Sequence, residues 1–466
     1  MSRIHLIGVC GTAMATLAAM LKHKGHDVSG SDQHVYPPMS DFLAAERIHV
    51  LEGYRPEHLD PRPDLVVVGN AISRGNPELE AMLDRGIRYA SMADTIRDQW
   101  LRDADAIGIA GAHGKSTTTS LTGWLLTAAG ADPTILVGGI AQNLGSDGAS
   151  YRIGQGRAFV IEGDEYDSAY FDKTAKFLKY LPDIAVINNI EFDHADIYRD
   201  LDEVRLAFRR LVNLVPKSGL TLLGIDSPDA AALASVARSR VQTFGLSADA
   251  EWRAVDIEVG QGTRFRVMRG GADLGVFTMP LLGDHNVRNA LVAIAVGVDL
   301  GLDVEKLREG LASFKGVKRR LEVVGLARGV TVYDDFAHHP TAVEETLKAI
   351  RRASPGTRIW AIFEPRSASS CRSVFQDDFA RAFAGADEVV IATVAKSNIP
   401  AAQRLSEVRL ADDLNARGCR ARHLPDVDAI VQAVSAEARE GDLIVVMSNG
   451  GFGGIHKKLV SALERP

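Results

Sequence analysis

Apolar runs separated by glycine-rich or polar turns recur along the whole chain. Residues 66–68, 106–110, 158–161 and 185–187 form such runs, rich in Val, Ile and Ala, as in strands buried on both faces. Helical stretches lie between them, and the chain contains 43 glycines. Strands that alternate with helices predict repeated βα units and parallel sheets, so the expected fold class is α/β.

The pattern restarts twice, which predicts three domains. A chain of 466 residues is too long for one ordinary core. A polar helix end gives way to a new strand near 102–104, and a glycine-containing basic stretch near 314–319 precedes another. We therefore expect a Rossmann-like domain at 1–103, a central P-loop ATPase-like domain at 104–317 and a C-terminal Rossmann-like domain at 318–466.

Composition and charge exclude several classes of protein. Hydrophobic residues make up 46% and charged residues 24% of the chain, as in average soluble proteins, and no apolar run approaches the roughly 20 residues of a membrane span. The N-terminus enters a strand directly, without the pattern of a secretion signal. A net charge of -7 argues against nucleic acid as a partner. The chain has three widely spaced cysteines, Cys10, Cys371 and Cys419, which fit neither a disulfide framework nor a metal site. We therefore expect a cytoplasmic protein.

A phosphate-binding loop is the clearest chemical motif. It follows the strand at 106–110 and comprises Gly111, Ala112, His113, Gly114, Lys115, Ser116, Thr117 and Thr118. Backbone N–H groups at such a turn point at phosphate oxygens, Lys115 adds a charge, and Ser116 can reach Mg²⁺. The motif departs from a standard Walker A because Ile109 replaces its first glycine. An ATP site is expected; the alternative is a plain strand-turn-helix joint.

Acidic residues follow the next two apolar strands of the central domain. Glu162 comes after the run at 158–161, and the loop after 185–187 carries Asp193 and His194. Hard oxygen ligands of this kind suit Mg²⁺. Glu162 and His194 are therefore the expected ligands, unless the acids simply form a solvated loop.

Asn289 stands near the start of an apolar helix, where its amide could recognise a purine. The competing explanation of this polar stretch is capping of the helix by Asp284 or Asn286.

The first domain begins in a Rossmann-like manner, with a strand, the loop 8–14, a helix and a second strand ending at Asp32. Cys10 and Ala13 replace the second and third glycines of a dinucleotide fingerprint, so NAD is weakly supported. A different diphosphate ligand is expected. Packing alone could also explain the glycines of this turn.

Strands of the third domain also end in polar groups. Two acids and two histidines follow the run at 330–333, and Glu364, Arg366 and Ser367 follow the run at 359–363. Arg366 is suited to bidentate binding of a carboxylate or phosphate. The glycine-rich loop after 443–447 is a further binding edge, or else a flexible turn.

Taken together, these motifs resemble the Mur ligase family, ATP-dependent amide-forming enzymes of bacterial cell-wall synthesis. The resemblance runs through all three domains. It is carried by 111–118, Glu162, 189–194, 285–289, Arg320 with Asp335, and 338–341, which stand in the family's order. The stretches 8–14 and 334–341 resemble the branch that uses UDP-N-acetylmuramate. Within this branch, five further stretches resemble the enzymes of peptidoglycan recycling: 36–40, 69–77, 192–196, 364–367 and 447–456.

The resemblance implies an ATP- and Mg²⁺-dependent ligase of peptidoglycan recycling. It would join the tripeptide L-alanyl-γ-D-glutamyl-meso-diaminopimelate to UDP-N-acetylmuramate through an acyl phosphate. The first domain would bind the UDP-sugar, the central domain ATP and the third domain the peptide. The nearest alternative adds free L-alanine; a nicotinamide-dependent reductase and a non-catalytic nucleotide-binding regulator are more distant ones. A monomer or weak homodimer is expected.

The resemblance also implies roles for individual residues. Lys115, His194 and Arg320 would be catalytic, and Lys115→Ala should abolish turnover with little loss of folding stability. Mg²⁺ would be held by Ser116, Glu162 and His194. ATP would be bound by Gly111, His113, Gly114, Lys115, Ser116, Thr117, Asn289, Arg320 and Asp335; the UDP-sugar by Gly8, Cys10, Gly11, Thr12, Met14, Asp32, Asn70 and Ser73; and the peptide by Arg366, Ser367, Asn449 and Gly451.

Two departures from other branches limit what the resemblance implies. Phe208 stands where several branches carry a carbamylated lysine, so that modification is not expected. The Asp-Asn-Pro-Arg motif with which another branch recognises diaminopimelate is missing from the sequence. The way in which that branch recognises the peptide therefore cannot be carried over to this chain.

Overall fold

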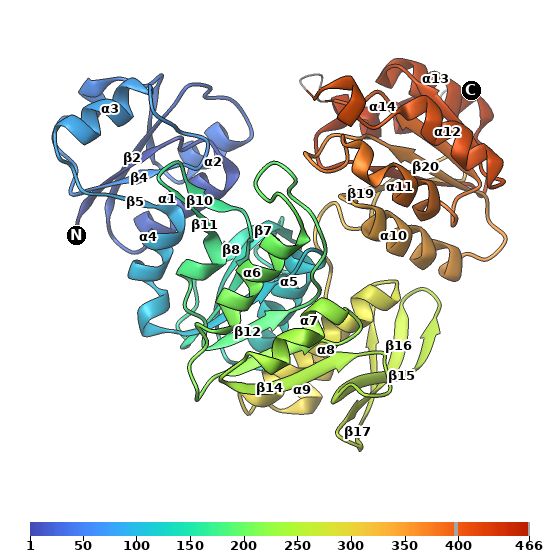
Figure 1. Ribbon diagram of the computed structural model, residues 1–466, viewed down its shortest axis with the longest axis horizontal. Helices are drawn as coiled ribbons and strands as arrows, with labels where there is room; N and C mark the ends of the chain where they lie inside the picture. Colours follow the sequence, from blue (N-terminus) through green and yellow to red (C-terminus); the bar gives the residue numbers. More distant parts are fainter. Residues whose placement is uncertain (396–398, 465–466) are drawn as a thin grey trace.

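Three sheets flanked by helices follow one another along the chain (Figure 1). The computed structural model describes residues 1–395 and 399–464. In Figure 1 the N-terminal part is blue, the central part runs from cyan through green to yellow, and the C-terminal part is orange and red. Most strand pairs in the three sheets are parallel, which confirms the α/β fold class predicted from the sequence.

The first sheet is entirely parallel, with the order β3-β2-β1-β4-β5. Because β1 lies in the middle with later strands on both sides, the strand order reverses beside it. Ligands of open α/β sheets bind at the carboxyl ends of such strands. The elements are β1 (Arg3–Ile7), α1 (Thr12–His23), β2 (Asp27–Asp32), α2 (Met39–Ala45), β3 (His49–Glu52), β4 (Leu65–Val68), α3 (Pro77–Asp84), β5 (Tyr89–Ser91) and α4 (Met92–Gln99).

The central sheet has the order β17-β16-β15-β14-β13-β12-β6-β9-β7-β8. It is parallel from β15 to β7 and antiparallel at both ends. Its strands are β6 (Asp105–Ala110), β7 (Thr134–Ala141), β8 (Ala149–Arg152), β9 (Ala158–Gly163), β12 (Ile184–Ile187), β13 (Leu220–Gly224), β14 (Arg240–Gly245), β15 (Trp252–Val259), β16 (Thr263–Arg269) and β17 (Ala272–Met279). The helices are α5 (Lys115–Ala128), α6 (Leu201–Val212), α7 (Pro228–Ala232), α8 (Asp284–Asp299) and α9 (Val304–Ala312); β10 (Asp167–Ala169) and β11 (Asp172–Ala175) form a separate hairpin.

Strand β6 positions the chemistry of the central part. It pairs in parallel with β12 on one side and β9 on the other, so the carboxyl ends of the three strands meet at one edge. The phosphate-binding loop leaves β6 at this edge, Glu162 lies at the end of β9, and residues 188–194 follow β12. The sequence motifs of the central domain therefore converge.

The third sheet has the order β18-β19-β23-β20-β21-β22, and only the edge pair β18 and β19 is antiparallel. A short turn joins these two strands, and two-residue connections permit only antiparallel pairing. The elements are β18 (Glu322–Ala327), β19 (Val330–Asp335), α10 (Pro340–Ala353), β20 (Ile359–Phe363), α11 (Gln376–Ala382), β21 (Glu388–Ala392), α12 (Glu407–Ala416), β22 (Arg420–Leu424), α13 (Val427–Glu437), β23 (Leu443–Met447) and α14 (Ile455–Leu463).

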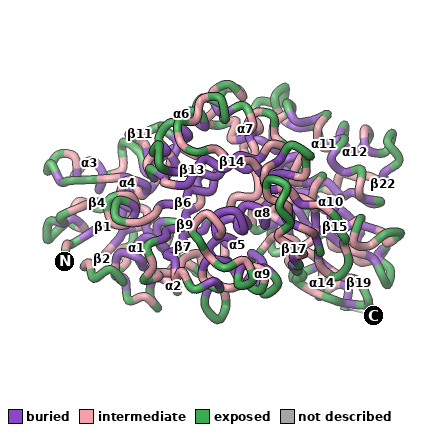
Figure 2. Tube along the Cα trace, turned by 90° about the horizontal axis from the view of Figure 1, so that it is seen from below, coloured by how far each residue is buried: buried purple, intermediate pink, exposed green. Residues whose placement is uncertain are grey.

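Buried apolar side chains link the N-terminal part to the central part more closely than they link the central part to the C-terminal part. One core cluster runs from α1 into β6 and β9 of the central part. The third sheet has clusters of its own on its two faces. Figure 2 shows the buried strands inside each part and exposed loops around them. Within residues 1–395 and 399–464, no helix combines the length and the apolar character that a membrane span needs.

Candidate active site

Two glycines give the phosphate-binding loop its shape. Gly111 has φ 141° and Gly114 has φ 81°, a region that other residues rarely adopt. A Cβ at Gly114 would lie 2.8 Å from Asn289 Oδ1, and one at Gly111 would lie 3.0 Å from the Asn189 nitrogen. Helix α5 then begins at Lys115 without a side-chain cap. Its first N–H groups are therefore open to an anion, as at other phosphate-binding helix starts.

A buried network surrounds the lysine of this loop. Lys115 Nζ donates hydrogen bonds to Gly111 O at 2.7 Å and to Glu165 Oε1 at 2.8 Å. His194 Nε2 lies 3.1 Å from the same Glu165 oxygen. Burial opposes the charge of both Lys115 and His194, but Glu165 and the other nearby acids outweigh it and raise the pKa of each. Lys115 is thus held as a cation at the mouth of the loop.

Glu165 is a site residue that the sequence motifs did not single out. It lies in an acidic run after β9, and such runs are usually solvated. In the structure it is only 3% exposed, and its Oε2 is a buried atom without a hydrogen-bond partner. Its position between two expected catalytic residues, rather than its sequence context, reveals its importance.

Ser116 and Glu162 lie together beneath the same loop. The Ser116 hydroxyl donates a hydrogen bond to Glu162 Oε1 at 3.0 Å, and the Gly138 N–H donates one to Glu162 Oε2 at 2.8 Å. Burial raises the pKa of Glu162, although Lys115 partly offsets this effect. A half-buried carboxylate beside a hydroxyl is a donor set that fits Mg²⁺. The third expected ligand, His194, contacts Glu165 instead.

Asn289 supports the phosphate-binding loop. Its side chain is buried, with Oδ1 accepting a hydrogen bond from Thr118 Oγ1 at 2.9 Å and Nδ2 donating one to Asn286 Oδ1 at 3.1 Å. These contacts join α8 to α5 beside Gly114. Recognition of a purine by Asn289 stays a prediction. The capping alternative is not observed, because the N-cap residue of α8 is Gly283 and no side chain caps the helix.

Arg320 and Asp335 lie where the third part meets the central part. The Arg320 guanidinium lies over the Phe336 ring, with 4.8 Å between Cζ and the ring centroid, and forms no hydrogen bond with the described residues. Burial lowers its pKa, while Asp335 and Glu162 act in the opposite direction. Asp335 accepts hydrogen bonds from the N–H groups of Leu321 at 2.7 Å and Ala337 at 2.8 Å. Arg320 therefore retains all its donors for an anion.

The first domain presents an open loop at the end of β1. Gly8 has φ 86°, and the Cys10 N–H donates a hydrogen bond to Asp32 Oδ2 at 2.8 Å. Gly11 is the N-cap residue of α1 and provides no side-chain cap, so the helix start is free. Of the other expected contacts, Thr12 and Ser73 are exposed and Met14 is buried. Asn70 Nδ2 donates a hydrogen bond to Asp167 Oδ1 of the central part at 2.9 Å.

The expected peptide contacts meet at the ends of the adjacent strands β20 and β23. Arg366 Nη1 donates a hydrogen bond to Glu364 Oε1 at 3.4 Å, and a side chain at Gly450 would collide with the guanidinium. Ser367 Oγ donates a hydrogen bond to Ser370 Oγ at 2.8 Å. Asn449 Oδ1 is a buried atom without a hydrogen-bond partner, and Gly451 is the N-cap residue of the next turn.

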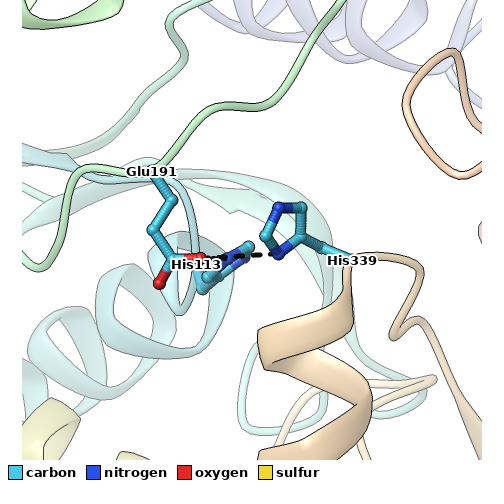
Figure 3. A group of neighbouring side chains, drawn as sticks. All are labelled: His113, Glu191 and His339. Atoms are coloured by element: carbon cyan, nitrogen blue, oxygen red, sulfur yellow. Dashed lines mark hydrogen bonds and ion pairs between the residues drawn. The ribbon is translucent and has the colours of Figure 1, made fainter. Parts of the chain in front are cut away.

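Polar contacts join the central and C-terminal parts beside the loop. Thr341 Oγ1 donates a hydrogen bond to Glu191 Oε2 at 2.6 Å, and Ser369 Oγ donates one to Asp193 Oδ1 at 2.5 Å. His339 lies next to His113 and Glu191 (Figure 3). The sequence indicated these segments separately, and the fold brings them into one interface.

Comparisons with known proteins agree with this architecture. Residues 3–100 match the family described as "Mur ligase family, catalytic domain", residues 109–297 the "Mur ligase middle domain", and residues 319–450 the "Mur ligase, glutamate ligase domain". The UDP-N-acetylmuramate–L-alanyl-γ-D-glutamyl-meso-2,6-diaminoheptandioate ligase of Escherichia coli is 40% identical, over 99% of this chain and 98% of its own.

Two further proteins show the same likeness. The UDP-N-acetylmuramate–L-alanine ligase of Salinibacter ruber is 35% identical, over 99% of this chain and 95% of its own. A solved murein peptide ligase from Psychrobacter arcticus is 36% identical, with a TM-score of 0.74 over 100% of this chain and 99% of its own. The chain therefore belongs to the Mur ligase family.

Proposed function

We propose that this protein is an ATP-dependent ligase of peptidoglycan recycling that joins L-alanyl-γ-D-glutamyl-meso-diaminopimelate to UDP-N-acetylmuramate. The observation that carries the proposal is the convergence of Lys115, Glu162 and Arg320 on the phosphate-binding loop. The 40% identity with an E. coli ligase of this specificity supports the choice of substrates. The protein acts in the cytoplasm as a monomer or weak homodimer.

Each of the three domains binds one of the three substrates. Residues 1–103 bind the UDP-sugar at the open start of α1, where backbone N–H groups suit a diphosphate. Residues 104–317 bind ATP, and residues 318–466 bind the peptide acceptor. In the third domain, Arg366 is 49% exposed as a side chain and can receive a carboxylate of the peptide.

ATP is bound by the loop from Gly111 to Thr117. Because α5 begins without a side-chain cap, its N–H groups donate to the phosphates, and Lys115 adds a positive charge beside them. Arg320 approaches from the opposite domain with its donors free. Asp335 accepts a hydrogen bond from the Leu321 N–H and so fixes the backbone next to Arg320. Asn289 maintains the loop itself.

Mg²⁺ is expected at Ser116 and Glu162, with His194 nearby. The fit rests on the half-buried Glu162 carboxylate, whose Oε1 lies 3.0 Å from the Ser116 hydroxyl at the start of α5. A bound Mg²⁺ would neutralise negative charge on the phosphates. Further compensation in this region comes from Lys115 and His194, which hold the Glu165 carboxylate between them.

The reaction then needs little covalent chemistry from the protein. The lactyl carboxylate of UDP-N-acetylmuramate attacks the γ-phosphate of ATP and gives an acyl phosphate and ADP. The neutral α-amine of the peptide attacks the acyl carbonyl, and phosphate and one proton of the amine leave as the amide forms. The first step brings two anions together, and negative charge develops in the tetrahedral intermediate of the second. Positioning and charge neutralisation by Lys115 and Arg320 therefore account for most of the catalysis.

A second candidate is the addition of free L-alanine to the same acceptor. The 35% identity with the S. ruber ligase favours it, because that relative also covers nearly the whole chain. The two candidates share UDP-N-acetylmuramate, ATP and the first chemical step. They differ only in the amine that opens the acyl phosphate.

Phosphate release distinguishes the candidates. The purified protein is incubated with ATP, Mg²⁺ and UDP-N-acetylmuramate, and either the tripeptide or L-alanine is added. We expect sustained release with the tripeptide and only background release with L-alanine. Turnover with L-alanine alone would assign the protein to the second candidate, and release with neither amine would refute both.

A further inference from the structure

Two histidines and a glutamate converge at the interface between the central and C-terminal parts (Figure 3). His113 belongs to the phosphate-binding loop, Glu191 follows β12, and His339 precedes α10. One ligand atom from each lies within 4.8 Å of the other two. His113 Nε2 lies 3.2 Å and His339 Nδ1 lies 3.5 Å from the same oxygen, Glu191 Oε2.

The hydrogen bond on the far side of the His339 ring determines the state of its Nδ1 atom. His339 Nε2 lies 3.2 Å from the carbonyl oxygen of Phe192, which can only accept, so Nε2 carries the hydrogen. Nδ1 of the neutral ring then presents a lone pair. Nδ1 is buried and has no hydrogen-bond partner. Metal-binding histidines are commonly oriented in this way, with the other nitrogen donating to a backbone carbonyl.

No hydrogen lies between His339 and the neighbouring carboxylate when the ring is neutral. Its Nδ1 lies 3.5 Å from Glu191 Oε2, and the hydrogen of the ring is on Nε2, facing Phe192 O. Glu191 Oε2 already accepts a hydrogen bond from Thr341 Oγ1 at 2.6 Å. A lone pair therefore faces a carboxylate oxygen inside the protein. A cation between the two atoms would turn this unfavourable contact into a favourable one.

The two distances to Glu191 Oε2 suit a tetrahedral ion. Zinc lies about 2.0–2.2 Å from histidine nitrogen and carboxylate oxygen, so neighbouring ligand atoms in a tetrahedron are about 3.4 Å apart. The two separations from Glu191 Oε2, at 3.2 and 3.5 Å, match this edge. His113 binds the ion as the neutral tautomer with its hydrogen on Nδ1, so that Nε2 presents its lone pair to the ion. Two imidazoles and one carboxylate leave a fourth position open for water.

We propose that His113, Glu191 and His339 form a binding site for a zinc-like divalent transition metal, separate from the Mg²⁺ ligands Ser116 and Glu162. Imidazole nitrogen selects such ions over Mg²⁺, which prefers oxygen. The site joins two domains, because His113 and Glu191 come from the central part and His339 from the C-terminal part. A bound ion clamps the phosphate-binding loop to α10.

Cobalt provides a direct test, because tetrahedral Co²⁺ absorbs visible light. The full-length protein is titrated with Co²⁺ in excess Mg²⁺, without ATP, and Zn²⁺ is then added. We expect an absorption band that saturates at about one ion per chain and disappears as Zn²⁺ displaces Co²⁺. The absence of a band would overturn the proposal.

Four variants locate the ion. His339→Ala and Glu191→Gln should each weaken Co²⁺ binding by about 10-fold or more. His285→Ala is the matched control, because His285 also faces the domain interface, with Nδ1 3.6 Å from Glu345 Oε2, but lies outside the cluster. Glu162→Gln tests binding at the expected Mg²⁺ site, and both controls should keep the band. A band that survives His339→Ala, or that Glu162→Gln removes, would contradict the assignment.

Discussion

Lys115 and Glu165 form a buried ion pair, with Nζ 2.8 Å from Oε1 and the glutamate side chain 3% exposed. The pair places a cation at the phosphate-binding loop before any phosphate is present. It also fixes Glu165 between Lys115 and His194, whose Nε2 shares the same oxygen. The lysine thus has a structural partner as well as an expected catalytic role.

Lys115→Ala is predicted to reduce turnover by at least about 100-fold, because the charge beside the transferred phosphate is lost. The sequence alone predicted little effect on folding. The buried pair changes that expectation, because removal of one partner from a buried carboxylate costs about 1–3 kcal/mol of unfolding free energy. Steady-state phosphate release and urea denaturation measure the two effects.

The double variant Lys115→Ala, Glu165→Gln separates the two roles of the lysine. Neutralising Glu165 removes the unpaired charge, so part of the lost stability should return while turnover stays low. If the double variant recovered turnover together with stability, Lys115 would be structural only.

Gly114→Ala is predicted to raise the KM for ATP strongly. The new Cβ would lie 2.8 Å from Asn289 Oδ1 at a residue with φ 81°, so the loop must shift. Gly130→Ala is the matched control, because Gly130 has φ 91° beyond the other end of α5 but nothing within 4 Å of the added atom. In both variants, backbone strain should lower the free energy of unfolding by about 1–2 kcal/mol. An equal KM for the two would contradict the assigned role of Gly114.

Neighbouring arginines should respond differently to the same substitution. Arg320→Lys is predicted to lower kcat with little change in Tm, because the guanidinium makes no hydrogen bond within the described parts of the chain. Arg319→Lys should lower Tm, because Arg319 Nη2 donates hydrogen bonds to Ser448 O at 2.6 Å and Gly450 O at 2.7 Å. Activity assays and thermal unfolding of both variants test this contrast. A large loss of Tm in Arg320→Lys would argue for a structural role.

The contact between Glu345 and the central part should give a pH-dependent stability. The neighbouring His285 makes the largest contribution to the pKa of Glu345, which is lowered to about 2. Burial opposes this shift, and the positive charge of Arg288 adds to it. A carboxylate with a lowered folded-state pKa stabilises the protein above its unfolded pKa of about 4.5, and the contribution is lost as pH falls toward 2. Lys348 Nζ, 4.0 Å from Oε1, adds a further positive charge.

Glu345→Gln measures this contribution. Its Tm should lie below that of the wild type at pH 7, and the difference should shrink as the pH is lowered from about 5 to about 3. The carboxylate is 23% exposed, so we expect it to contribute no more than about 1–2 kcal/mol to the free energy of unfolding at pH 7. A difference in Tm that stays constant over this range would show that the ionisation of Glu345 does not contribute.

Local patterns predicted the strands and loops of this protein well. The apolar run at 443–447 is β23, and the run at 106–110 lies within β6, because buried parallel strands are continuously apolar. The shape of the phosphate-binding loop also follows from its own glycines. The antiparallel edges β8, β16, β17 and β18 were not expected, because their pairing depends on neighbours rather than on composition.

Long-range contacts could not be predicted from the sequence. Glu165 is one acid among several after β9, and only its burial between Lys115 and His194 distinguishes it. Asn289 stays a predicted ATP contact, and the sequence did not indicate that its amide accepts a hydrogen bond from Thr118. The proximity of His113 and His339 depends on how two domains meet, which no local pattern records.

Oxygen transfer tests the central claim most directly. UDP-N-acetylmuramate labelled with heavy oxygen in its lactyl carboxylate is incubated with ATP, Mg²⁺, the tripeptide and the protein, and the released phosphate is analysed by mass spectrometry. Because the carboxylate attacks ATP and the amine then displaces phosphate, one labelled oxygen should appear in each phosphate released. Tripeptide-dependent release of unlabelled phosphate would contradict the acyl-phosphate mechanism, and label transfer with L-alanine in place of the tripeptide would contradict the proposed acceptor.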